Sequence, residues 1–176
     1  MLDPDRHAIR LIGRYARYHR DQRNITTHFI GVPLVVFALG VLLGRPTWAG
    51  GWSPAWALWT LATLWYLTRG DFLLGLATSA VTGALVALAA PLAAGGTTLW
   101  LGAGVGTLLL GWLAQAIGHY YEGRRPAVLD DPSGVLVGPM FLVAQWLFAQ
   151  GWRAALRAEV ERLAGPTHLR DLTQPA

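Results

Sequence analysis

The stretch FLLGLATSAVTGALVALAAPLAAGGTTLWLGAGVGTLLLGWLAQAIGHYY, residues 72–121, contains no Asp, Glu, Lys or Arg. Residues 24–44, 46–68 and 132–152 are also free of these charged residues. About 20 consecutive apolar residues allow a helix to cross the hydrocarbon core of a bilayer. Only 14% of the 176 residues are charged, against roughly 25% in soluble domains. We therefore predict an all-α, polytopic membrane protein that forms a single domain over residues 1–176.

The apolar runs predict four transmembrane helices within a membrane bundle over residues 28–150. Their expected ranges are 28–43, which is short for a full crossing, 54–68, 72–92 and 98–121. Gly138-Pro139 disfavours a regular crossing by the last apolar stretch, so residues 135–150 are expected to form a re-entrant or interfacial helix.

The two ends of the chain are expected to lie outside the bundle. Residues 4–23 combine apolar side chains at spacings of three and four with many arginines. This pattern predicts a basic amphipathic helix on an anionic membrane surface, or alternatively a solvated helix packed on the bundle. Residues 151–176 are expected to form a cytoplasmic tail.

Arginine placement predicts the orientation of the bundle. With four spans, only Arg45 falls on one side, whereas the other 13 arginines fall on the side that holds both termini. The positive-inside rule then makes both termini cytoplasmic. All 14 basic residues are Arg, which indicates a GC-rich bacterial genome and hence an inner-membrane location. Because most arginines flank apolar runs, the net charge of +4 predicts membrane anchoring and no nucleic-acid partner.

Three of the five histidines lie where this topology brings distant residues together. His19 and His28 precede or open the first span, and His119 closes the fourth span at the same membrane face. Neutral imidazoles are good ligands for Fe, Zn, Ni and Cu, and a thiolate site is excluded because the chain has no cysteine. We predict a metal site of these three residues; the alternative is that they only contact water or lipid head groups.

Polar residues near these histidines are further candidates. Gln115, His119 and Glu122 share one helix face because they are four and three residues apart. Glu122 is interpreted as a carboxylate ligand, as a residue that orients His119, or as a partner of Arg124 or Arg125. Asn24 is interpreted as a hydrogen-bond partner of a ligand or as a helix cap.

Two blocks of residues resemble the signatures of the Mpo1-like family. They are Tyr15-x-x-Tyr18-His19 with Asn24-x-x-x-His28 and Val32-Pro33, and Gly111-Trp112-x-x-Gln115-x-x-Gly118-His119 with Glu122-Gly123-Arg124-Arg125-Pro126-Ala127, Asp130 and Gly138-Pro139. The resemblance covers about residues 11–150. It implies an Fe(II)-dependent dioxygenase in a membrane that shortens long-chain 2-hydroxy fatty acids by one carbon (alpha-oxidation), with O2 as co-substrate and membrane lipid around it.

The resemblance also implies roles for individual residues. The family histidines correspond to His19, His28 and His119, which would hold the iron. Beside them, the further candidate catalytic residues are Tyr18, Asn24, Gln115, Glu122 and Arg125. Arg124 or Arg125 would pair with the substrate carboxylate, unless they serve only as membrane anchors. Two other functions stay open: a Zn(II)-dependent membrane hydrolase that uses the same histidines, and a non-enzymatic lipid-binding membrane protein.

Overall fold

The computed structural model describes residues 4–69 and 71–173, which form seven α-helices and two short 3-10 helices with no β-strand among them. The α-helices are α1 (Pro4–Ala16), α2 (Gln22–Gly44), α3 (Pro54–Arg69), α4 (Phe72–Ala93), α5 (Thr97–Glu122), α6 (Gly134–Ala149) and α7 (Ala154–Ala164). The 3-10 helices are η1 (Ala49–Gly51) and η2 (Ala127–Leu129). The all-α membrane bundle predicted from the sequence is confirmed.

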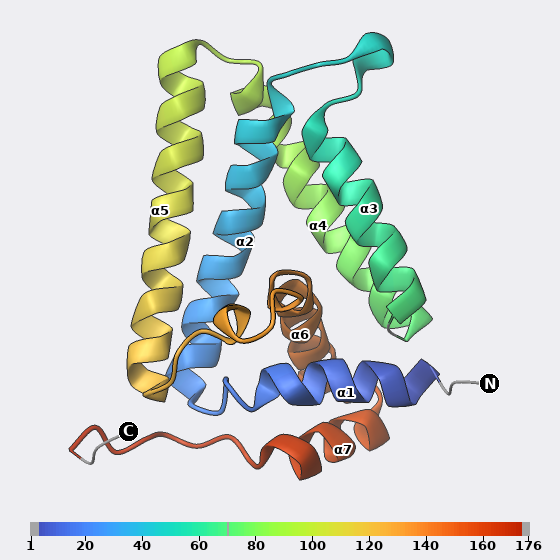
Figure 1. Cartoon of the computed structure of the whole chain (residues 1–176), viewed down its shortest axis with the longest axis vertical. Helices are drawn as coiled ribbons and strands as arrows, with labels where there is room; N and C mark the ends of the chain where they lie inside the picture. The colour runs from blue at the N-terminus through green and yellow to red at the C-terminus, as the bar shows by residue number, and fades with distance from the viewer. Residues whose placement is uncertain (1–3, 70, 174–176) are drawn as a thin grey trace.

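Helices α2 to α5 run the height of the molecule in alternating directions (Figure 1). By length and composition, three of the described helices can cross a membrane, namely α2, α4 and α5. Helix α3 is shorter, at 16 residues, and lies alongside α4. The alternation places the start of α2 and the end of α5 at the same end of the bundle (Figure 1).

The first span is longer than the sequence indicated. It was expected at 28–43, but α2 contains 23 residues and begins at Gln22. Asp21 is its N-cap, because the Asp21 side chain accepts a hydrogen bond from the backbone N–H of Arg23. The prediction that this span is short for a crossing is therefore wrong.

Helices α2 and α5 approach closely through glycines. A Cβ atom on Gly31 would lie 2.7 Å from the carbonyl oxygen of Gly111, and one on Gly111 would lie 2.8 Å from the carbonyl oxygen of Gly31. Neither backbone can move away without separating the helices. Small residues at a contact of this kind let helices in lipid gain van der Waals contact.

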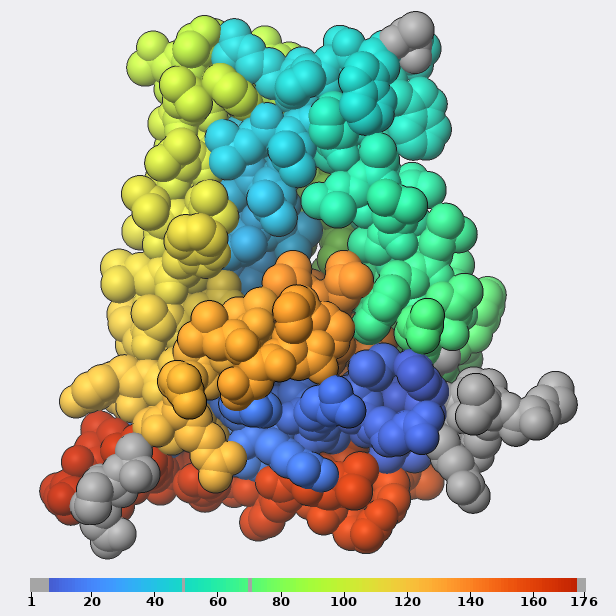
Figure 2. Space-filling model, viewed as in Figure 1, coloured from blue at the N-terminus to red at the C-terminus, as the bar shows by residue number. Residues whose placement is uncertain are grey.

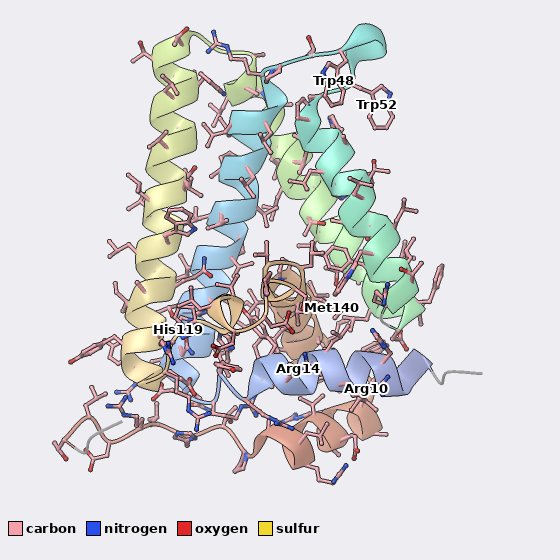
Figure 3. The ribbon with its side chains drawn as sticks, in the orientation of Figure 1. Arg10, Arg14, Trp48, Trp52, His119 and Met140 are labelled. Carbon is pink, nitrogen blue, oxygen red and sulfur yellow. The ribbon has the colours of Figure 1, made fainter. Side chains whose placement is uncertain are left out.

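Helices α1, α6 and α7 lie at the end of the bundle where α5 finishes. Figure 1 views α6 close to its axis, so α6 lies across the direction of the four long helices, as a re-entrant or interfacial helix would. In Figure 2, α1 lies below the segment that precedes α6 and above α7. Figure 3 shows Arg10 and Arg14 on α1 at this end, and Trp48 and Trp52 at the opposite end.

One prediction about the N-terminal end of the chain needs correction. The amphipathic segment was expected as one helix over 4–23 on a membrane surface, but α1 ends at Ala16. Its apolar residues Ala8, Ile12 and Ala16 are fully buried against the bundle, which matches the alternative of a helix packed on the protein.

The segment after residue 150 is not a free tail. Helix α7 packs against α1, and Arg153 forms an ion pair with Asp71 at the start of α4. Residues 174–176 lie outside the described part of the chain.

Candidate metal centre

Three histidine side chains meet at the base of the bundle. His19 lies in the turn between α1 and α2, His28 lies in α2, and His119 lies in the last turn of α5, where Figure 3 labels it. Their ring centroids are 4.5, 5.1 and 5.0 Å apart. The side chains are 0%, 1% and 8% exposed, and one nitrogen from each lies within 4.8 Å of the others.

Hydrogen bonds to the backbone fix the protonation of two of these rings. The Nδ1 atom of His19 lies 2.9 Å from the Tyr15 carbonyl oxygen, and the Nδ1 atom of His28 lies 2.9 Å from that of Asn24. A carbonyl oxygen only accepts, so each Nδ1 carries the proton and each neutral ring has a lone pair on Nε2. These two Nε2 atoms face each other at 3.2 Å.

Two lone pairs at this distance repel unless a cation lies between them. A second proton on His19 is disfavoured, because burial, and next the neighbouring His28, lower the pKa of His19 well below 6.5. A metal ion held by both Nε2 atoms would resolve the conflict. The two backbone carbonyls would then orient the imidazoles from behind, as is usual for metal-bound histidine.

His119 supplies a third nitrogen. It is buried, and its Nδ1 atom has no hydrogen-bond partner among the described residues. Buried polar atoms are rarely left unpaired, so such an atom points to a ligand. Three neutral imidazoles without thiolate or carboxylate fit Fe, Zn, Ni or Cu and leave coordination positions open.

Tyr15 and Phe141 enclose the His19 ring. The Tyr15 ring stacks on His19 with 4.1 Å between centroids and 8° between planes, and Phe141 of α6 lies 5.7 Å from His19. Sequence reasoning did not place Tyr15 in the site. Its position four residues before His19, which is the spacing of one helical turn, was the available signal.

Glu122 holds the turn that carries His19. Its Oε1 accepts from the backbone N–H of Arg20 at 2.9 Å, and its Oε2 accepts from the backbone N–H of Asp21 at 2.9 Å and from Asn24 Nδ2 at 2.9 Å. These described hydrogen bonds run from Glu122 to the turn and to Asn24, and they make Glu122 a support of the turn that carries His19.

Asn24 completes this link from inside α2. Its Nδ2 also donates to the Tyr18 carbonyl oxygen at 3.1 Å, and the helix cap expected of Asn24 is instead provided by Asp21. Gly118 of α5 faces it, and a Cβ there would lie 2.5 Å from Asn24 Oδ1 and would collide with Thr27 Oγ1. Only glycine fits at this crossing of α2 and α5.

The C-terminal segment fastens the same turn from outside. The backbone N–H of His168 donates to the Arg20 carbonyl oxygen at 2.9 Å, and the N–H of Gln22 donates to the His168 carbonyl oxygen at 3.0 Å. The Arg20 guanidinium donates to the Gly165 carbonyl oxygen at 2.7 Å. We call residues 165–170 the strap. No feature of its sequence indicated this contact.

Asp21 joins the turn, the helix cap and the strap. It forms an ion pair with Arg23 at 2.7 Å and accepts from the backbone N–H of Arg170 at 2.8 Å. Burial alone would raise the pKa of Asp21, but the hydrogen bonds from Arg23 and Arg170 outweigh it and lower the pKa to about 2.

The remaining candidates lie around the site without a described hydrogen bond to the imidazoles. Tyr18 donates to Asp130 at 2.9 Å beside a cavity of about 380 Å³. Gln115, in α5, directs its amide to the Gly111 carbonyl oxygen at 3.4 Å. Arg125 is exposed on the surface, and Arg124 donates to the Arg17 carbonyl oxygen at 2.9 Å. Arg20, which directly follows His19, is buried and donates from its Nε to the His19 carbonyl oxygen at 3.0 Å.

Comparisons with known proteins agree with this geometry. The family model described as "2-hydroxy-palmitic acid dioxygenase Mpo1-like" matches residues 7–150, which include all three histidines. The protein named 2-hydroxy-palmitic acid dioxygenase MPO1 from Saccharomyces cerevisiae is 29% identical over 153 residues, or 85% of each chain. No solved structure matches. The chain belongs to the Mpo1-like family.

Proposed function

We propose that the protein is an Fe(II)-dependent dioxygenase that shortens long-chain 2-hydroxy fatty acids by one carbon. The observation that carries the proposal is the pair of Nε2 lone pairs 3.2 Å apart in a buried group of three neutral imidazoles. The similarity to the yeast 2-hydroxy-palmitic acid dioxygenase supports this substrate class and reaction.

The proposed reaction balances without a further reductant. One 2-hydroxy acid and one O2 give the acid with one carbon less, one CO2 and one water; the C1–C2 bond breaks and the former C2 becomes the new carboxyl carbon. Four electrons pass from the substrate to O2. Iron, when bound, supplies the O2 chemistry.

The residues of the chain hold and shield this site. His19, His28 and His119 would bind the ion, and the Tyr15 and Asn24 carbonyls keep the first two rings in the correct tautomer. Glu122 fixes the turn. Tyr15 and Phe141 exclude water from the His19 ring, which limits side reactions.

The test combines metal analysis with oxygen uptake by the purified protein in detergent. We expect about one iron per chain, O2 uptake with 2-hydroxyhexadecanoic acid, and a pentadecanoic acid product. Hexadecanoic acid, which lacks the 2-hydroxyl group, is the control and should give no uptake. Zinc without iron, together with no oxygen uptake, would favour the hydrolase alternative and overturn the proposal.

We also propose that the histidine end of the bundle faces the cytoplasm of a bacterium. The exposed arginines Arg10, Arg14 and Arg17 lie at this end, and Arg45 lies at the other. Because the chain has no cysteine, single cysteines can be introduced cleanly. In intact cells, a membrane-impermeant maleimide should label Thr47→Cys and spare Thr173→Cys; the reverse pattern would invert the orientation.

A further inference from the structure

An apolar groove lies between α6 and the helices above it. It consists of two hollows of about 200 and about 110 Å³, which share Val36, Thr82 and Pro139. The larger hollow extends along α2 to Phe29, and the smaller one extends to Leu43 and to Ala62 of α3. Figure 2 shows a recess between α2 and α3, above the start of α6, with α4 at its back.

The lining of the groove suits a hydrocarbon chain. No charged side chain lines either hollow. The Thr82 hydroxyl donates to the carbonyl oxygen of Thr78 at 2.8 Å within α4, so it is not free to bind a polar ligand. Such a surface favours an apolar occupant, since each buried CH₂ group contributes about 0.8 kcal/mol.

Two residues that line the larger hollow lie close in the chain to residues of the histidine site. Val32, which lines the larger hollow, lies one turn above His28 on nearly the same face of α2. Leu142, which also lines it, follows Phe141, whose ring lies 5.7 Å from that of His19. Two separate helices therefore lead from the metal centre into the same hollow.

The length of the groove matches that of an acyl chain. Along α2 the lining runs from Val32 to Leu43, which is about 17 Å at 1.5 Å per residue. One leaflet of a bilayer core, which holds extended acyl chains, is about 15 Å thick.

We propose that this groove binds the acyl chain of the substrate, with the 2-hydroxy carboxylate at the histidines. The inference rests on the proposed function. A free acid fits better than a membrane phospholipid, because the histidines are at most 8% exposed and leave no room for a large head group. The far hollow, lined by Leu39, Leu58 and Ala62, then limits the chain length.

The first test shortens the groove at its far end. Ala62→Phe fills the smaller hollow, and Ala87→Phe on the exposed face of α4 is the matched control. We expect Ala62→Phe to reduce kcat/KM for 2-hydroxyhexadecanoic acid at least tenfold, the loss expected when about two methylene groups leave an apolar site. The value for 2-hydroxyoctanoic acid should change less than twofold. An equal change for both acids would overturn the proposal.

The second test needs no turnover and no substitution. Hexadecanoic acid with a diazirine at its terminal carbon is photolysed with the unmodified protein in detergent, and the adducts are located by mass spectrometry. Adducts on residues that line the groove, lost on addition of 2-hydroxyhexadecanoic acid, support the proposal even if the protein proves not to be a dioxygenase. Adducts on exposed residues of α5 such as Leu109 and Leu113 instead would overturn it.

Discussion

Helices α2 and α5 contact each other along their length, but the two halves of this contact use different chemistry. In one half, which starts within a turn of His28 and runs away from the histidines, Gly31 packs against Gly111, Gly104 packs against Leu42, and the Trp100 indole donates to the Val41 carbonyl oxygen at 2.9 Å. In the other half, Asn24 and His28 face His119 and Glu122. One half depends on shape, and the other depends on hydrogen bonds and charge.

The contacts of the first half stabilise the bundle, whereas those of the second half support the candidate functional site. Polar groups within a membrane region are expensive and are retained mainly for function. In the middle of the bundle, buried polar residues such as Thr78 and Ser79 satisfy their own helix carbonyls at 2.8 Å. At the histidine end, by contrast, buried polar residues bond across helices.

Removal of a histidine tests the functional half most severely. We expect His28→Ala to lower oxygenase activity by about 100-fold or more, because loss of a ligand exceeds the 10–100-fold effect of losing a supporting contact. Iron content should fall with it, while circular dichroism shows an unchanged helix content. His168→Ala, whose side chain is exposed, should retain both iron and activity. Full activity of His28→Ala would contradict the functional role given to the histidine half of the α2–α5 contact.

Glu122→Gln tests the hydrogen bonds of the same half. The amide replaces one acceptor oxygen by a donor that faces the N–H groups of Arg20, Asp21 and Asn24. We expect the free energy of unfolding in detergent to fall by about 3 kcal/mol, as for a buried charged acceptor that loses its partners. Glu159→Gln, in an exposed pair with Arg162, should change the free energy of unfolding much less, because water screens an exposed pair. Equal effects would contradict the special role of Glu122.

A glycine series tests the half that depends on shape. Gly111→Ala should destabilise the bundle by about 1–3 kcal/mol, because the new Cβ meets a rigid backbone oxygen. Gly104→Ala should cost less, since the end of the Leu42 side chain can rotate away. Gly102→Ala meets nothing within 4 Å and should be neutral or stabilising by about 0.5–1 kcal/mol. Thermal unfolding in detergent checks this order, and any other order would refute it.

Mild acid should lower the free energy of unfolding through the histidine half of the contact. Because the pKa of His19 is below 6.5 in the folded protein, the unfolded chain binds more protons once the pH falls below 6.5. The unfolding free energy of the metal-free protein should therefore decline there, by at most about 1.4 kcal/mol per pH unit for this residue. Asp21 contributes only further down, between pH 3.8 and about 2, since its pKa is lowered. In His19→Ala, the slope below pH 6.5 should be smaller; an unchanged slope would exclude His19.

The long helices could be predicted because the hydrocarbon core of a bilayer allows few backbone conformations other than a helix. The expected spans 72–92 and 98–121 differ by only one residue at an end from α4 and α5, at Phe72–Ala93 and Thr97–Glu122. Uncharged runs of this length form helices, since each backbone group must be satisfied within its own segment. The approach of the three histidines to one another could also be predicted, because successive helices run in opposite directions.

The turn at residues 17–20 could not be predicted, because its partners are distant in sequence. No glycine or proline interrupts residues 14–23, and local spacing favoured a continuous helix. The chain turns where Glu122, 102 residues after Arg20, accepts the backbone N–H groups. The role of Glu122 was missed for the same reason: its partners are backbone groups, which have no sequence signature.

The strap is synthesised after all three histidines of the candidate metal centre. Residues 19, 28 and 119 leave the ribosome well before residues 165–170, which close the hydrogen bonds on the turn of His19. The turn is therefore complete only after the strap has been made, which follows the synthesis of helices α1 to α7. A nascent chain that ends before residue 165 would hold the three histidines without this support, so the proposed metal would be bound most tightly only after the strap is in place.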